Sequence, residues 1–257
     1  MNPPLHSKII GKGPAFVILH GFLGMSDNWK TLGNKYAENG YEVHLVDQRN
    51  HGRSFHSKDF DYDFLAGDLK TYVQHHQLEE IVLLGHSMGG KTAMQFACDH
   101  APRVAKLLVA DIAPKFYPAH HQPIIDGLNK LNFDAIQSRS EADEQLAHHI
   151  SDWGTRQFLL KNLYWVEKGR LALRFNLPVL SDKMNEVGEN IGAGNHFDGP
   201  TLFLKGDRSE YITDADLPEI ERHFPQADLQ TITKAGHWLH AENPKEFFEK
   251  SMQFLNS

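Results

Sequence analysis

The sequence predicts an α/β fold, with a mostly parallel sheet flanked by helices and a helical lid inserted into it. Short apolar runs alternate with stretches of helical periodicity over the first 111 residues. Runs that are apolar along their whole length indicate parallel strands covered on both faces. The alternation stops near residue 114 and resumes at Thr201. We therefore expect one core formed by residues 1–113 and 197–257, interrupted by a lid at residues 114–196.

The elements of the predicted core follow in chain order. Its first strands are Ala15–Leu19, Glu42–Val46, Glu80–Leu84 and Lys106–Ala110. Between these strands, apolar residues recur at three- or four-residue spacing, which is typical of helices. The predicted helices are Ser26–Glu38, Tyr62–His76 and Met88–His100. After the lid come strands at Thr201–Leu204 and Asp228–Thr233 and a helix at Pro244–Leu255.

The lid segment differs from the core in composition. It begins with a Pro-rich stretch at residues 113–123, continues with helical periodicity and few strand-like runs, and closes with the Gly-rich Gly188–Gly199. Large aromatic side chains contribute most to small hydrophobic cores. We therefore expect the lid core, more than the lining of a pocket, to contain Phe116, Tyr117, Trp153 and Trp165.

The composition argues against several classes of function. Of 257 residues 40% are hydrophobic, and 26 Lys and Arg against 33 Asp and Glu give a net charge of −7. Because nucleic-acid binding depends on a basic surface, we expect no nucleic-acid partner. Residues Met1–Gly13 lack a signal-peptide pattern, and no apolar run is long enough for a membrane span. We expect a cytoplasmic protein, monomeric or homodimeric, that acts on a small molecule.

The cysteine and histidine content gives no metal-binding pattern. Cys98 is the only cysteine, so no intrachain disulfide can form. Although the chain has 17 histidines, adjacent pairs such as His120-His121 do not share a helix face and chelate poorly. The sequence contains neither His-Glu-x-x-His nor Cys-x-x-Cys. We expect no metal ion and no organic cofactor.

The sharpest motif is Gly85–Gly89, with the sequence GHSMG, between a predicted strand and a predicted helix. A serine on such a tight turn presents its Oγ at the start of a helix. The amides that follow it face an incoming carbonyl group. This context predicts a nucleophile at Ser87, with a helix-capping serine as the alternative.

An overlapping motif gives a competing interpretation. Gly85–Thr92 (GHSMGGKT) also fits the phosphate-binding pattern G-x-x-x-x-G-K-[ST], with Asp111 as a candidate magnesium ligand. The segment between Lys91 and Asp111 has room for one helix and one strand. P-loop folds usually place a further strand and helix there. A P-loop nucleotide hydrolase is therefore the less favoured interpretation.

Four motifs together resemble the α/β-hydrolase superfamily. They are Leu19–Gly24 (LHGFLG), Asp47–Ser54 (DQRNHGRS), Gly85–Gly89 and Ala235–Trp238 (AGHW). In order, they are similar to the oxyanion turn, the strand-4 loop, the nucleophile elbow and the catalytic-histidine turn of that family. The combination is also similar to small bacterial esterases that accept acyl-CoA thioesters. The resemblance covers nearly the whole chain and implies the α/β-hydrolase fold.

The resemblance also implies catalytic roles. His237 is the expected general base, because the family places serine, acid and histidine in that order. Asp111 and Asp207 each follow a predicted strand and compete for the role of the acid. The family's commonest acid position holds Ser209 here, and Asp207 lies at the wrong offset. We favour Asp111, since the acid must reach the histidine Nδ1.

The predicted oxyanion donors are the backbone amides of Phe22 and Met88, which resemble those of the family. His20 is expected to anchor the first of these loops. Arg49 and Arg53 are expected to brace the neighbouring loop, with contact to an anionic substrate as the alternative.

These residues predict a serine hydrolase. It would cleave carboxylic esters or thioesters with short to medium acyl chains, acyl-CoA among them, through an acyl-enzyme formed on Ser87. His237 would act as the base and Asp111 as the acid. Two other classes stay open, a non-catalytic ligand-binding receptor on a hydrolase fold and the P-loop nucleotide hydrolase.

Overall fold

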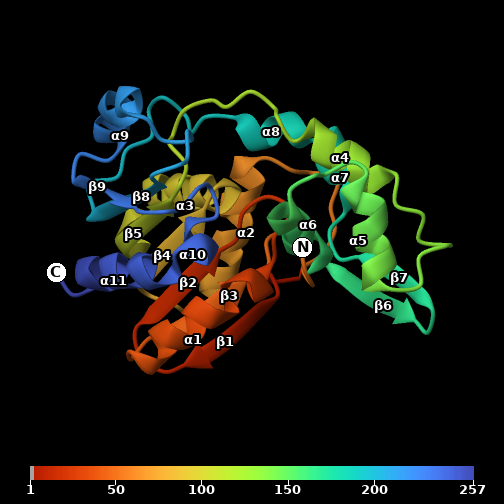
Figure 1. Ribbon diagram of the computed structural model, residues 1–257. Helices are drawn as coiled ribbons and strands as arrows, with labels where there is room; N and C mark the ends of the chain where they lie inside the picture. The colour runs from red at the N-terminus through yellow and green to blue at the C-terminus, as the bar shows by residue number, and fades with distance from the viewer. Residues whose placement is uncertain (1–2) are drawn as a thin grey trace.

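The computed structural model describes residues 3–257 of the chain. The centre of the protein is a seven-stranded sheet (Figure 1). Its strands are β1 (Ser7–Gly11), β2 (Ala15–Leu19), β3 (Glu42–Val46), β4 (Ile81–His86), β5 (Val104–Ala110), β8 (Thr201–Gly206) and β9 (Ala227–Ile232). They lie in the order β1-β3-β2-β4-β5-β8-β9. Strand β1 is antiparallel to β3, and every other neighbouring pair is parallel.

Helices cover both faces of the sheet. They are α1 (Lys30–Glu38), α2 (Tyr62–His75), α3 (Met88–Asp99), α9 (Leu217–His223), α10 (Leu239–Glu242) and α11 (Pro244–Leu255), with short 3-10 turns η1 (Ser26–Trp29), η2 (Ala101–Arg103) and η3 (Asp214–Asp216). Alternate side chains of β2 show the arrangement. Phe16 and Ile18 join a cluster with α1 and α11, whereas Val17 and Leu19 join one with α2 and α3. Burial on both faces explains why these strands are apolar throughout.

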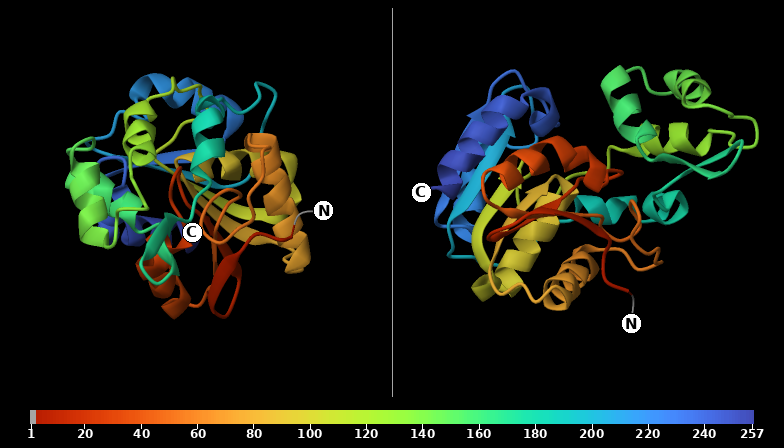
Figure 2. Two further views of the ribbon diagram at one scale, coloured as in Figure 1. Left: turned by 90° about the vertical axis from the view of Figure 1, so that its right-hand side faces the viewer. Right: turned by 90° about the horizontal axis from the view of Figure 1, so that it is seen from below.

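A second group of elements, called the cap here (residues 122–188), lies between β5 and β8. It consists of α4 (Gln122–Asn129), α5 (Arg139–Ala147), α6 (Trp153–Leu160), β6 (Leu163–Glu167), β7 (Arg170–Leu173), α7 (Leu177–Asp182) and α8 (Met184–Gly188). The cap and the C-terminal helix lie on opposite sides of the molecule (Figures 1 and 2). The cap has its own apolar cluster, which reaches Phe22 and Met88 at the ends of the core strands. The lid boundaries expected from the sequence stay a prediction.

Several features differ from the sequence-based expectations. The edge strand β1 and the β6–β7 hairpin are short strands that the periodicity did not reveal. The prediction that the lid core contains three of the large aromatic residues is wrong. These residues are exposed, with fractions of 53% for Phe116, 66% for Trp153 and 53% for Trp165. Tyr117 is partly buried and packs against the core cluster of α2 and α3. Among residues 3–257, no helix has the length and apolarity that a bilayer crossing needs.

Candidate active site

Ser87 lies in a strained turn between β4 and α3. Its φ of 54° and ψ of −121° fall in a region that costs a non-glycine residue about 1–3 kcal/mol. Two glycines make the turn possible. A Cβ atom on Gly85 would collide with the backbone of Gly89, and one on Gly89 would collide with carbonyls at the end of β2. The Ser87 N–H donates to the Ala110 carbonyl at 3.0 Å, which fixes the turn against β5.

The turn at Gly21 and Phe22 lies directly against Ser87. A Cβ atom on Gly21 would stand 3.3 Å from the Cβ of Ser87. The Gly24 N–H closes this turn on the Gly21 carbonyl at 3.0 Å. On the other side, Met88 is the first residue of α3, where the helix dipole favours negative charge. The two predicted oxyanion residues, Phe22 and Met88, therefore adjoin Ser87 from two different segments.

Two buried histidines hold the oxyanion turn in place. His20 donates from Nδ1 to the Gly21 carbonyl at 2.8 Å and accepts the Gln48 N–H at Nε2 at 3.0 Å. His51 accepts the Leu23 N–H at 3.2 Å. Burial lowers the pKa of both imidazoles, which keeps them in the neutral form that can accept these bonds. His20 is thus placed as an anchor of the loop.

Neither arginine of the neighbouring loop lines the cavity described below. Buried Arg49 donates to both carboxylate oxygens of Asp68, at 2.6 and 2.8 Å, and to the Asp59 carbonyl at 2.8 Å. The side chain of Arg53 is exposed, while its backbone N–H donates to Asp47 at 2.9 Å. Arg49 therefore connects the loop after β3 to α2.

Asp111 and His237 form a hydrogen-bonded pair. Asp111 follows β5, and its Oδ2 lies 2.7 Å from His237 Nδ1. The carboxylate also accepts the Gly206 N–H at 3.1 Å and the Ser209 hydroxyl at 2.5 Å. Because a carboxylate can only accept, Nδ1 carries the proton and Nε2 is the free acceptor. The tautomer that a general base requires is thereby set.

Burial controls the ionisation of this pair. It lowers the pKa of His237 to about 3, with a further contribution from His120, and raises the pKa of Asp111 to about 6. Hydrogen bonds from Ser209 and Gly206 partly oppose the rise. At neutral pH the imidazole is therefore neutral while the carboxylate is charged, which is the state in which His237 can accept a proton.

Asp207 lies elsewhere. Its exposed carboxylate accepts the N–H groups of Lys234 and Ala235 at 2.9 and 3.0 Å, and these bonds lower its pKa. Asp207 therefore stabilises the turn that leads to His237 and does not contact the imidazole. Of the two aspartates that the sequence offered, the structure brings Asp111 to His237.

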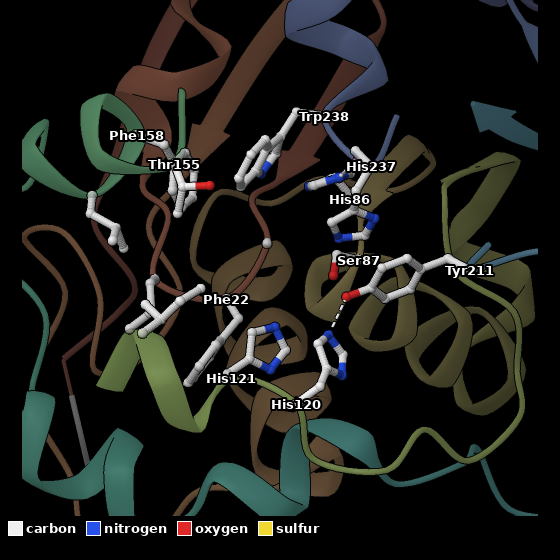
Figure 3. Close-up of a pocket in the computed structure, with 14 residues that line it drawn as sticks. Phe22, His86, Ser87, His120, His121, Thr155, Phe158, Tyr211, His237 and Trp238 are labelled. Carbon is white, nitrogen blue, oxygen red and sulfur yellow. Dashed lines mark hydrogen bonds between the residues drawn. The ribbon is translucent and has the colours of Figure 1, made fainter. Parts of the chain in front are cut away.

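Tyr211 and His120 are site residues that the sequence analysis missed. The Tyr211 ring stacks on His237, with centroids 3.8 Å apart and planes 14° apart. Its hydroxyl lies 2.5 Å from His120 Nε2 (Figure 3). His120 Nδ1 faces the Pro118 carbonyl at 3.0 Å and therefore carries the proton, so Tyr211 is the donor. These residues precede and follow the cap, and no local motif marks either.

His86 also supports the loop that carries His237. His86 Nε2 donates to the His237 carbonyl at 2.7 Å, and burial lowers the pKa of His86 to about 3. The neighbouring His240 stacks on Trp29 with centroids 4.2 Å apart. The loop that carries His237 is thus held by neutral imidazoles.

Ser87 and His237 both line one apolar cavity of about 220 Å³. Its walls come from the oxyanion turn and from α4 and α6, among them Leu23, Ile124 and Phe158. Figure 3 shows Ser87 between His237, Tyr211 and Phe22. No hydrogen bond joins Ser87 Oγ to His237 within residues 3–257. Such bonds often form only in the substrate complex.

No cluster of three or more His, Cys, Asp or Glu side chains suited to a metal ion occurs within residues 3–257. The arrangement instead provides a hydroxyl on a strained turn, a neutral imidazole oriented by a carboxylate, and adjacent backbone amides. These are the groups that acyl transfer uses.

Comparison with known proteins places this fold and site in a class. The family model for the alpha/beta hydrolase fold matches residues 14–135, and relatives more than 30% identical align along almost the whole chain. The chain belongs to the α/β-hydrolase family. The nucleotide-hydrolase interpretation is therefore wrong. Lys91, its candidate phosphate ligand, is buried and donates to the Gly188 carbonyl of the cap at 2.9 Å.

Particular relatives are esterases and lipases. The sn-1-specific diacylglycerol lipase ABHD11 of Mus musculus is 38% identical over 249 residues, covering 94% of this chain and 81% of that protein. Esterase YbfF of Escherichia coli is 33% identical over 243 residues, covering 93% and 92%. The solved structure of a marine microorganism esterase is 40% identical, with a TM-score of 0.94 and coverage of 98% and 99%. These similarities support ester hydrolysis by this chain.

Proposed function

We propose that the protein is a serine hydrolase that cleaves carboxylic esters through an acyl-enzyme. The observation that carries the proposal is that Ser87 and His237 line one apolar cavity while Asp111 is hydrogen-bonded to His237. Thioesters with short to medium acyl chains, including acyl-CoA, react by the same steps and are further candidate substrates.

In the first half-reaction Ser87 Oγ attacks the ester carbonyl while His237 Nε2 takes its proton. The Phe22 and Met88 amides stabilise the negative charge on the carbonyl oxygen. Asp111 stabilises the imidazolium that forms. His237 then gives the proton to the leaving oxygen, the carbon–oxygen bond breaks, and an acyl group remains on Ser87. Water, activated by the same imidazole, releases the acid and restores Ser87.

The cavity walls favour an apolar substrate. The walls from the oxyanion turn and α6 contain Phe22, Leu23, Phe158 and Leu159. No Asp, Glu, Lys or Arg side chain is among the described residues that line this cavity. Recognition would therefore depend on apolar burial, which is worth about 25 cal/mol per Å².

The test is labelling by a serine-directed phosphonate, followed by intact-protein mass spectrometry, beside turnover of a short-chain p-nitrophenyl ester. Ser87→Ala should lose the adduct and lower kcat by about 10⁴–10⁶, because it removes the attacking atom. The matched control is Ser140→Ala, which changes an exposed serine on α5 and should keep both. Near-normal turnover in a folded Ser87→Ala protein would contradict the proposal. Folded wild type with neither adduct nor turnover would favour the ligand-binding receptor.

A further inference from the structure

Two cavities meet at Ser87. The larger, of about 220 Å³, is lined by His237 and Trp238 as well as by cap residues. The smaller, of about 20 Å³, is lined by Ser87 and Met88 and also by Met184 and Val187 of α8. A substrate with two substituents on its reacting carbon could place one in each cavity.

Three side chains, His120, His121 and Tyr211, line both cavities and therefore form the partition between them. The partition is held from several directions. Tyr211 stacks on His237 and donates to His120 (Figure 3). The Tyr117 hydroxyl donates to the Tyr211 carbonyl at 2.6 Å. The two cavities are thus separate spaces with a common opening at Ser87.

The chemistry of the reaction assigns one substituent to each cavity. In the tetrahedral intermediate the reacting carbon carries Ser87 Oγ, the oxyanion, the acyl substituent and the leaving oxygen. The leaving oxygen must receive a proton from His237, and His237 lines only the larger cavity. The leaving group therefore occupies the larger cavity. The acyl substituent, which needs no contact with the imidazole, occupies the smaller one beside Met88.

The size of the smaller cavity limits the acyl group. A space of about 20 Å³ is close to the minimum that holds one water molecule, and so admits a group about the size of a methyl. Its far wall is anchored to the core. The Tyr62 hydroxyl on α2 donates to the Val187 carbonyl at 2.7 Å, and Lys91 on α3 donates to the Gly188 carbonyl at 2.9 Å.

We propose that the preferred substrates are acetate esters of bulky apolar alcohols, with the acetyl methyl group in the smaller cavity. This inference rests on the proposed function and names its substrate class. Ser87 Oγ bonds to the acetyl carbon as the carbon–oxygen bond to the alcohol breaks. The alcohol leaves with the proton from His237, and water then releases acetate.

Two isomeric esters test the assignment. Hexyl acetate and methyl heptanoate have the same composition and alkoxide leaving groups of similar basicity, but opposite distributions of bulk. We expect kcat/KM to be at least tenfold higher for hexyl acetate than for methyl heptanoate. A ratio of this size is typical when one of two substrates has one or more methylene groups too many for a pocket. A higher value for methyl heptanoate would overturn it, because the bulky acyl group would then fit better than the bulky alcohol.

Substitutions in the two cavities test it further. Met184→Ala and the milder Val187→Ala enlarge only the smaller cavity, and each should raise the hexanoate-to-acetate ratio of kcat/KM for p-nitrophenyl esters by about tenfold. Ile124→Ala is the matched control, because Ile124 lines only the larger cavity, and it should leave that ratio unchanged. An unmoved ratio in both folded α8 variants would overturn the assignment. If no ester is turned over and the phosphonate does not label Ser87, the proposed function itself fails.

Discussion

The core strands and the cap contribute to the same site in different ways. Two of the proposed catalytic residues of the core directly follow strand ends, with Ser87 after β4 and Asp111 after β5. The cap contributes mostly apolar walls, from Ile124 on α4 to Val187 on α8. The chemistry of the site therefore depends on the sheet, whereas its shape depends on how the cap packs.

The two regions are also held by different interactions. In the core, a backbone bond to the neighbouring strand, or to its end, fixes Ser87 and Asp111. The Ser87 N–H donates to Ala110 and the Asp111 N–H donates to Leu204. Several cap-to-core bonds involve single side chains instead, such as the 2.9 Å bond from the Asn162 amide to the Leu23 carbonyl. Changes at Ser87 and Asp111 should therefore abolish most of the activity, and changes in the cap should alter selectivity.

The largest effect after loss of the nucleophile is expected at the acid. Asp111→Asn should lower kcat by about 10⁴, because an amide beside Nδ1 favours the wrong imidazole tautomer. Asp207→Asn is the matched control. It should change kcat by less than about threefold, since Asp207 is exposed and its hydrogen bonds are to the backbone amides of Lys234 and Ala235. Steady-state kinetics of the folded variants measure both, and the opposite ranking would transfer the role of the acid to Asp207.

The pH dependence should report the same pair. In the proposed mechanism the active form holds an ionised Asp111 and a neutral His237, so activity should be lost as the pH falls and the pair takes up a proton. Burial raises the pKa of Asp111 to about 6 and lowers that of His237, so kcat/KM should be constant above pH 7. Below about pH 6 it should fall tenfold per unit. A profile that is flat from pH 5 to 8, or a midpoint above pH 7, would contradict this assignment.

Tyr211 should have a smaller effect, because it acts through His237. Tyr211→Leu removes the stacked ring, an interaction worth about 0.5–1.5 kcal/mol, and should lower kcat/KM by about two- to tenfold. It should also shift the acid limb of the pH profile, which a purely structural defect would leave in place. Tyr211→Phe keeps the ring and should restore most of the activity. Equal losses in both variants would instead assign the effect to the hydroxyl bond with His120.

The core fold could be predicted from the sequence because its signals are local. Strands such as β2 and β3, which are buried on both faces, give continuous apolar runs, and those two were predicted with their exact ends. Strand β1 is a half-exposed edge strand, so its burial pattern gives no such run. In the cap, the β6–β7 hairpin and the exposed Trp153 depend on tertiary packing, which periodicity does not record.

The candidate site likewise contains residues that a local motif predicts and residues that no local motif predicts. Ser87 is predictable because its turn needs glycine at fixed neighbouring positions, and these leave a motif in the sequence. The choice between Asp111 and Asp207 could not be settled by spacing, since both follow strands. Tyr211 and His120 lie far apart in the sequence and meet only because the chain returns from the cap to β8. Contacts of this kind leave no local pattern.

The smallest expected effect separates the two regions most directly. Tyr62→Phe and Tyr36→Phe each remove one buried hydroxyl, the first bonded to Val187 of the cap at 2.7 Å and the second to Ser251 of α11 at 2.6 Å. Each should lower stability by about 1 kcal/mol and Tm by about 2–4 °C. Only Tyr62→Phe loosens a wall of the smaller cavity, so it alone should raise turnover of longer acyl chains relative to acetate. Thermal unfolding and the acyl-chain ratio measure the two effects. An equal change in the ratio for Tyr36→Phe would mean that the shape of the cavity depends on the stability of the whole protein rather than on the attachment of the cap.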